Sequence, residues 1–264
     1  MKNPYELYPE TYVKLLALIR DFAAHQTSDR LPAEESLAAQ LGVSRVKIRD
    51  VLSQLEAAGY VTRKRGVGTT INRYVLTEGA RLDIDSIYVD MVSHYGHRPR
   101  TALHALRLLR QPAPDVAARL RLGADEAVYL IEKQVFADDT PVIVVDDYIP
   151  ARYYDNGKCD LAMIDTNIFF FLQSMCDELL ETLMVHMDAC AASGALTETM
   201  QVPEGYLLMK LDSVCYTQAS EAILYSVEYY NTKILPFSFQ KRVFSGKFKR
   251  TLPPDSLQTK PGEA

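Results

Sequence analysis

Apolar and polar positions alternate most clearly between residues 31 and 71. Pro32 and the apolar positions after it predict a helix over residues 33–41, because proline lacks the amide hydrogen for which a first helical turn has no acceptor. Gly42 suits a left-handed helix end, and Ser44 can cap a second helix with its hydroxyl. One buried stripe of the second helix repeats at helical spacing, namely Ile48, Val51, Leu52 and Leu55.

A β-hairpin is predicted directly after the second helix, which Gly59 ends. Two β-prone runs, at residues 60–63 and 69–71, flank a glycine-containing turn at residues 64–68. The tip of this hairpin is cationic because it contains Arg63, Lys64 and Arg65. A further amphipathic helix is expected over residues 9–25, where it would pack on the two helices that follow.

The pattern changes after residue 83, where short helices alternate with apolar strands. Helices are expected at residues 86–95, 114–122, 167–180 and 196–200. Strands are expected at residues 104–110, 127–136, 142–149, 183–191, 206–216, 222–230 and 237–244. A short helix, a strand, a turn and a second strand occur twice, with a period of about 80 residues. This region is therefore expected to be an α+β domain with one mixed, mainly antiparallel sheet and helices against one face.

A helix, a tight turn and a second helix followed by a basic hairpin have the geometry of a winged helix-turn-helix. In that arrangement the second helix enters the DNA major groove, and its first residues meet base edges. Arg45 and Arg49 lie four residues apart on its wet flank, and an arginine fork can donate two hydrogen bonds to guanine. Val46 can meet a thymine methyl group, whereas the cationic tip suits phosphates. Two arginines on a helix more often only belong to a solvent-exposed face. Here the N-cap, the buried stripe and the basic hairpin together favour DNA binding.

Length and charge agree with two domains of different roles. The first 75 of the 264 residues carry 11 basic and 8 acidic side chains, a net charge of +3. The remainder carries 18 basic and 26 acidic side chains, a net charge of −8, as expected when a DNA reader is joined to a domain of another kind. No apolar run approaches the roughly 18 residues of a membrane helix, and the first residues form no signal core, so a cytoplasmic protein without membrane contact is expected.

Residues 31–71 resemble the winged-helix DNA-binding domain of the GntR family of bacterial transcription regulators. The positions that carry the resemblance are Leu31, Pro32, Glu34, residues 41–45, Arg49, Leu55, Glu56, Gly59, Gly66, Gly68 and Thr69. The resemblance implies base contacts by Arg45 and Arg49 and minor-groove contacts by the wing glycines. Glu35 stands where the family usually has arginine; a carboxylate there would repel phosphate but could accept a hydrogen bond from cytosine N4. The predicted DNA-binding residues are Glu35, Ser44, Arg45, Val46, Lys47, Arg49, Arg63, Lys64, Arg65, Gly66, Gly68 and Thr69.

The order of the later elements resembles the UTRA ligand-binding domain, which follows the winged helix in the HutC branch of this family and whose fold is similar to chorismate lyase. The matching segments are residues 148–150, 202–205 and 225–230. The resemblance implies a DNA-binding domain at residues 1–71 and an effector-binding and dimerisation domain at residues 84–247. Residues 72–83, which show no strong period, are expected to be a linker, and the proline-containing residues 248–264 are expected to be a disordered tail.

UTRA proteins that sense phosphorylated sugars hold them with two arginines, an early serine and polar groups on later strands. Here Ser86 occupies the serine position, Lys133 and Val135 replace the arginines, and Val145 and Leu224 replace glutamates. The resemblance therefore implies an effector less charged than a sugar phosphate, in a more apolar and aromatic pocket. The predicted effector-binding residues are Ser86, Lys133, Tyr148, Asn167, Phe169 and Tyr230.

The function expected from these patterns is a ligand-responsive transcription regulator. It would be a homodimeric repressor, which a small-molecule effector releases from a near-palindromic operator. Two other classes stay open: a protein-interaction module whose helix-turn-helix is only a fold element, and a chorismate-lyase-like enzyme. Against the enzyme, the sequence shows no nucleophile–base pair, no phosphate-binding loop and no metal-ligand spacing among its five histidines and four cysteines. No metal or other cofactor is expected.

Overall fold

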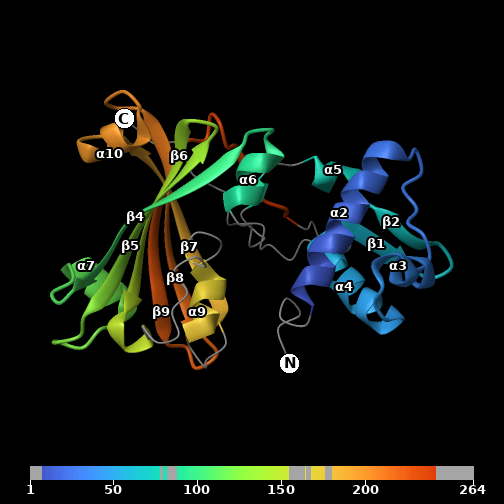
Figure 1. The fold of residues 1–264 in the computed structure, drawn as a ribbon, viewed down its shortest axis with the longest axis horizontal. Coiled ribbons are helices and arrows are strands. Elements are labelled where there is room, and N and C mark those ends of the chain that lie inside the picture. Colours follow the sequence, from blue (N-terminus) through green and yellow to red (C-terminus); the bar gives the residue numbers. More distant parts are fainter. Residues whose placement is uncertain are drawn as a thin grey trace, which may run out of the picture.

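The chain forms an N-terminal head, largely helical, and a larger body built around one sheet (Figure 1). The computed structural model describes residues 8–77, 80–81, 88–154, 164, 168–175 and 180–241. In this part of the chain, no helix combines the length and the apolar character needed to cross a membrane.

The head is a winged helix-turn-helix around a single apolar core. Its elements are α2 (Pro9–His25), α3 (Glu34–Leu41), α4 (Arg45–Ala57), β1 (Val61–Lys64) and β2 (Gly68–Ile71). The predicted stripe of α4 is confirmed, because Ile48, Val51, Leu52 and Leu55 are all fully buried. Gly42 ends α3 with φ at 66°, and the Ser44 hydroxyl accepts a hydrogen bond from the Lys47 backbone amide at 3.2 Å, both as the sequence predicts.

The segment expected as a linker contains two short ordered elements. Helix α5 (Arg73–Leu76) packs Val75 into the core of the head. Strand β3 (Ala80–Arg81) pairs in parallel with β10 (Phe237–Ser238), which lies far away in the sequence. Both elements are too short to show a hydrophobic period, so the sequence pattern did not predict them. The C-terminal end of the body is thereby tied to the segment that leaves the head.

The body is organised by one antiparallel sheet. Its strands are β4 (Pro99–Leu109), β5 (Val128–Ala137), β6 (Thr140–Pro150), β7 (Leu180–Ala191), β8 (Leu207–Thr217) and β9 (Ala222–Tyr230). Their order is β4-β5-β6-β9-β8-β7, and every pair in it is antiparallel. The two predicted repeats are the β5–β6 and β8–β9 hairpins, which meet where β6 pairs with β9. The one parallel pair among the described strands lies outside this sheet.

Helices cover both faces of the sheet, so the expectation of one covered face was wrong (Figure 1). Helices α6 (Tyr88–His94) and α9 (Ile168–Met175) lie on one face, and α7 (Pro114–Leu120) and α10 (Ala195–Met200) on the other. Both faces are covered because consecutive residues of a strand, which point to opposite faces of the sheet, are apolar. Val145 packs with α6, while the adjacent Val144 packs with α10.

Several element boundaries differ from the sequence prediction. The helix predicted to reach residue 180 ends at Met175 in its described part, and Leu180 instead begins β7. Strand β4 begins at Pro99, five residues before its predicted start. A short 3₁₀ turn, η1 (Ala151–Tyr153), follows β6. The last predicted strand, at residues 237–244, forms a strand only at Phe237–Ser238 among its described residues. Residues 242–244 and the whole tail at residues 248–264 lie outside the described residues.

Candidate functional site

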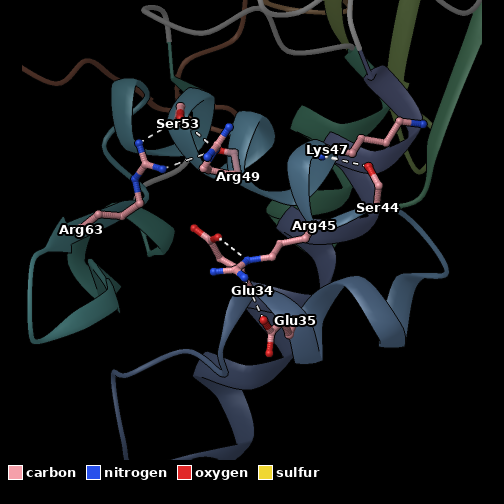
Figure 2. Close-up of polar contacts among 8 residues, drawn as sticks. All are labelled: Glu34, Glu35, Ser44, Arg45, Lys47, Arg49, Ser53 and Arg63. Atoms are coloured by element: carbon pink, nitrogen blue, oxygen red, sulfur yellow. Dashed lines mark hydrogen bonds and ion pairs between the residues drawn. The ribbon is translucent and has the colours of Figure 1, made fainter.

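The first two turns of α4 carry Arg45 and Arg49, two of the side chains that the sequence assigns to base reading (Figure 2). Arg45, Val46 and Arg49 are exposed, because the buried stripe of α4 faces the opposite side. The Lys47 ammonium lies 4.4 Å from the centre of the Tyr8 ring, so this cation is held toward the start of α2. The helix therefore offers two long guanidinium forks and one apolar side chain to solvent.

Arg45 is held by two carboxylates of α3 (Figure 2). Its Nη1 donates to Glu35 Oε1 at 2.8 Å, and its Nε donates to Glu34 Oε2 at 3.4 Å. The side chains of Arg45 and Glu35 stay 63% and 75% exposed. Glu35, predicted to lie at the DNA surface, is therefore also a partner of a predicted base-reading residue.

Arg63 joins the wing to α4, and its phosphate contact stays a prediction. Its Nε donates to Glu56 Oε2 at 2.9 Å, and its Nη2 donates to Ser53 Oγ at 2.9 Å. Its Nη1 donates to the backbone carbonyl of Arg49 at 3.4 Å (Figure 2). Every nitrogen of the guanidinium group is thus engaged within the head, because residue 63 lies on the side of β1 that faces α4.

The wing tip remains a cationic surface. Lys64 and Arg65 are exposed, and neither has an acidic partner among the described residues. Gly66 and Gly68 have φ of 81° and 101°, a backbone that side chains rarely adopt. Arg30, which the sequence did not single out, lies beside the wing. A Cβ atom at Gly68 would be 3.3 Å from the Arg30 Nε. A hollow of about 430 Å³ between wing and helices is lined by Glu34, Glu56, Arg63, Lys64, Arg65, Gly68 and Thr69.

A second polar group of side chains is buried in the body, on the sheet face that α6 covers. The Lys133 ammonium lies 2.8 Å from Asp147 Oδ2, and the two side chains are 1% and 0% exposed. The other Asp147 oxygen accepts a hydrogen bond from the Ser226 hydroxyl. The Lys133 ammonium also lies 5.6 Å from the centre of the Tyr88 ring. These contacts join α6, β5, β6 and β9.

Glu228 completes this cluster, which is called the buried cluster and consists of Tyr88, Lys133, Asp147, Ser226, Glu228 and Tyr230. Four of its members are buried, whereas Tyr88 and Glu228 are half-buried. The hydroxyls of Tyr88 and Tyr230 each donate to one Glu228 carboxylate oxygen at 2.6 Å. Burial raises the pKa of Glu228, although both tyrosine hydrogen bonds act in the opposite direction. Burial and the Glu228 charge raise the pKa of both tyrosines well above the usual value. The tyrosines are therefore hydrogen-bond donors at neutral pH.

Two of the six predicted effector residues, Lys133 and Tyr230, belong to this cluster. Tyr148 does not belong to it. Lys133 pairs with Val145 of β6, and only residues of β6 that are an even number of positions from Val145 share the face of Val145. Tyr148 instead stacks on Tyr225 on the opposite face. Phe169 packs in the apolar layer under α9, and Ser86 and Asn167 lie outside the described residues.

The sequence reading missed four members of the cluster, namely Tyr88, Asp147, Ser226 and Glu228. Strand alternation carried the signal for some of them. Residues 143, 145, 147 and 149 occupy one face of β6, so an inward carboxylate at position 147 could have been inferred. The pairing of β6 with β9, which brings Ser226 opposite Asp147, could not be inferred from one sequence.

A chain of contacts joins this cluster to the end of α4. The Tyr230 ring meets the Phe237 ring edge-on, with centres 4.8 Å apart, and Phe237 begins β10. Strand β10 pairs with β3, where Arg81 is only 6% exposed. The Arg81 Nη1 donates to the Ala58 carbonyl at 2.7 Å, and Ala58 is the C-cap of α4. Arg81 Nη2 also donates to Gln240 at 3.3 Å.

Comparison with known families assigns both parts of the chain. Residues 94–235 match the UTRA domain, and residues 7–71 match the family described as bacterial regulatory proteins, gntR family. The transcriptional regulator GgaR of Escherichia coli (strain K12) is 32% identical over 125 residues, which are 46% of this chain and 48% of that protein. The chain thus matches about half the length of that relative. The transcriptional repressor NagR of Bacillus subtilis (strain 168) is 22% identical over 229 residues, covering 87% and 92% of the two chains.

Solved structures show the same fold. The protein YydK of Bacillus subtilis matches with a TM-score of 0.68 at 18% identity, over 89% of this chain and 99% of that one. PhnF of Mycobacterium smegmatis matches with a TM-score of 0.55 at 19% identity, over 89% and 100% of the two chains. Since the UTRA match covers more than half of the residues and the gntR match covers the head, the chain belongs to the GntR family of bacterial regulatory proteins, among the members with a UTRA domain.

Proposed function

We propose that this protein is a ligand-responsive transcription regulator that acts in the cytoplasm as a repressor. The head binds a specific operator, and a small molecule bound in the body releases it. The observation that carries the proposal is the exposed pair Arg45 and Arg49 on the first turns of α4, beside a cationic wing tip. An arginine fork reads guanine in the major groove, and lysine and arginine at the wing suit phosphates.

The proposal is tested by binding of the purified chain to the DNA upstream of its own gene, with unrelated DNA of the same length as the comparison. We expect nanomolar affinity at physiological salt for the former and at least ~10³-fold weaker binding to the latter. The logarithm of affinity should fall with the logarithm of salt concentration with a slope near −5, as for about six phosphates. Equal and weak binding to both DNAs would instead favour an interaction module or an enzyme.

We propose that the functional unit is a homodimer joined through β7. This strand of 12 residues lies at one edge of the sheet, and nearly all of its residues are exposed. Its exposed apolar side chains are Leu183, Met184, Val185 and Met187, the last at 57%. Soluble proteins rarely leave a long apolar edge strand unpaired, because it would template association. A two-fold axis beside β7 would pair it with the same strand of a second copy.

Charges on β7 should therefore disrupt the dimer. We expect the change Leu183→Lys with Met187→Lys to give a monomer in sedimentation velocity at concentrations where the natural chain is a dimer. Leu108→Lys is the control, because Leu108 is 40% exposed on β4 at the opposite edge. An unaltered dimer in the β7 variant would place the interface elsewhere.

We infer that the effector binds at the buried cluster of the body and is neutral or cationic. The Lys133 charge is already matched by Asp147, and Glu228 adds a further acidic group supplied with two hydroxyl donors. The cluster therefore offers no uncompensated cation to a phosphate, in agreement with the replacement of the family's arginines in the sequence. Micromolar binding of glucosamine 6-phosphate in calorimetry would contradict this inference.

We propose that Arg81 couples the body to α4. Effector binding at Tyr230 would shift Phe237 and β10, and β10 is paired with the strand that carries Arg81. Gly59, just after α4, supports a close fit there, since a Cβ atom on it would come within 2.0 Å of Gln240. A coupling between sites of this kind typically amounts to about 1–3 kcal/mol.

Removing Arg81 should loosen the C-terminal end of α4. We expect Arg81→Ala to raise amide hydrogen exchange at Ala58, Gly59 and Tyr60 by roughly 10-fold, because the variant removes a hydrogen bond from a charged donor there. Arg98→Ala is the control, since Arg98 is exposed in the body. Exchange unchanged from the natural chain would show that Arg81 does not tie the two parts together.

A further inference from the structure

In the contact between Arg45 and Glu35, each side chain keeps polar atoms that have no partner within the described residues. Arg45 donates through Nη1 to Glu35 and through Nε to Glu34, while its Nη2 has no partner among the residues that the structure describes. Glu35 accepts through Oε1, and within the same part of the chain its Oε2 has no partner. Both side chains are exposed at the surface where α3 meets the start of α4 (Figure 2). The pair therefore presents N–H donors of Arg45 and one acceptor oxygen of Glu35 to solvent.

A preformed donor and acceptor can recognise DNA in a way that arginine alone cannot. Glu35 and Glu34 each engage one N–H group of Arg45, so the second N–H group of Nη1 and both N–H groups of Nη2 stay available to guanine. Arginine alone, however, offers no acceptor for the cytosine of the same pair. The free N–H groups of Arg45 beside a free carboxylate oxygen of Glu35 match the major-groove edge of a G·C pair. Guanine O6 accepts there, and the neighbouring cytosine N4 donates.

The charge of Glu35 also acts on DNA that lacks the matching pair. An exposed carboxylate near the phosphates repels them, and a hydrogen bond from cytosine N4 to this carboxylate offsets the repulsion at the matching base pair. An acidic residue at this point therefore weakens non-specific binding and leaves specific binding less affected.

We propose that Glu35 is a specificity-determining residue of the DNA interface, which reads one G·C pair in each half-site together with Arg45. The inference rests on the proposed function, and it deepens it by naming the base pair and the composite reader. Glu35 orients the Arg45 guanidinium and accepts from cytosine, while Arg45 donates to guanine of the same pair.

The test uses the full chain and a duplex that the natural protein enriches from random DNA. Glu35→Ala removes the acceptor, and Asp21→Ala is the control because it removes the same charge from an exposed site on α2. Affinity is measured for the enriched duplex, for duplexes with each base pair changed, and for unrelated DNA. We expect one G·C position per half-site at which the natural chain loses roughly 5- to 150-fold on change to A·T, and Glu35→Ala loses less than about 3-fold.

Two further results are expected. Arg45→Ala should lose its preference at the same position, and the double variant should lose no more than either single one, because the two side chains read one pair. Glu35→Ala should bind unrelated DNA more tightly than Asp21→Ala does. An equal rise in affinity for every DNA, with all base preferences kept, would overturn the inference and leave a plain surface ion pair. Absence of any base preference in the natural chain would overturn the proposed function as well.

Discussion

Replacing Arg45 and Arg49 together by alanine is expected to lower affinity for the operator more than 100-fold. Each good arginine contact with a base edge discriminates by about 1–3 kcal/mol, and in a two-fold dimer every such contact is removed twice. The fold of the head should survive, because both side chains are exposed and alanine is a strong helix former. The Arg49 group that Arg63 contacts is its backbone carbonyl, which the substitution keeps.

The control variant for this prediction is Lys64→Ala with Arg65→Ala. These exposed wing residues are assigned to phosphates, so their removal should weaken binding to all DNAs alike and reduce the salt slope by about 1 for each phosphate that is no longer neutralised. Fluorescence anisotropy with operator and unrelated duplexes measures both variants. If the arginine variant kept the ratio of specific to unspecific affinity, base reading by α4 would be ruled out.

Replacing Lys133 by methionine is expected to cost about 3–5 kcal/mol of unfolding free energy, because it leaves the Asp147 carboxylate buried without its cation. Methionine keeps most of the volume of the side chain, so the loss reflects charge and not a cavity. Chemical unfolding monitored by circular dichroism measures it. A loss of this size would use up a large share of the stability of an ordinary domain.

Two further variants separate the cause. Lys133→Met combined with Asp147→Leu should recover most of the loss, because a buried ion pair can often be exchanged for apolar groups at little cost. Lys14→Met should change stability by less than about 1 kcal/mol, since its pair with Glu10 is exposed. A single Lys133→Met variant as stable as the natural chain would mean that Asp147 is not buried as a charge.

The local features of the head could be predicted from the sequence. The Ser44 cap, the left-handed Gly42 and the stripe along α4 are set by neighbouring residues and by the period of a helix. The alternating strands and the repeat in the body were predictable for the same reason. Features that depend on which strands are neighbours could not be predicted. The pairings of β6 with β9 and of β3 with β10 join segments that are distant in the sequence.

Side-chain partnerships across elements were the least accessible from the sequence. Tyr148 was assigned to the pocket of Lys133 although the register puts it on the other face of the sheet. The contacts of Arg63 with Glu56 and Ser53 were not predicted from the sequence. Glu35 was recognised as a departure at the DNA surface, but its pairing with Arg45 depends on how α3 crosses α4.

The most direct test of the account is selection of bound duplexes from a random DNA library by the purified natural chain. We expect enrichment of a two-fold symmetric motif with half-sites about 10 bp apart, because two heads related by a two-fold axis meet successive turns of the major groove. The variant with Arg45 and Arg49 changed to alanine should enrich no motif. Failure of the natural chain to enrich any sequence would contradict the central claim that this head reads DNA.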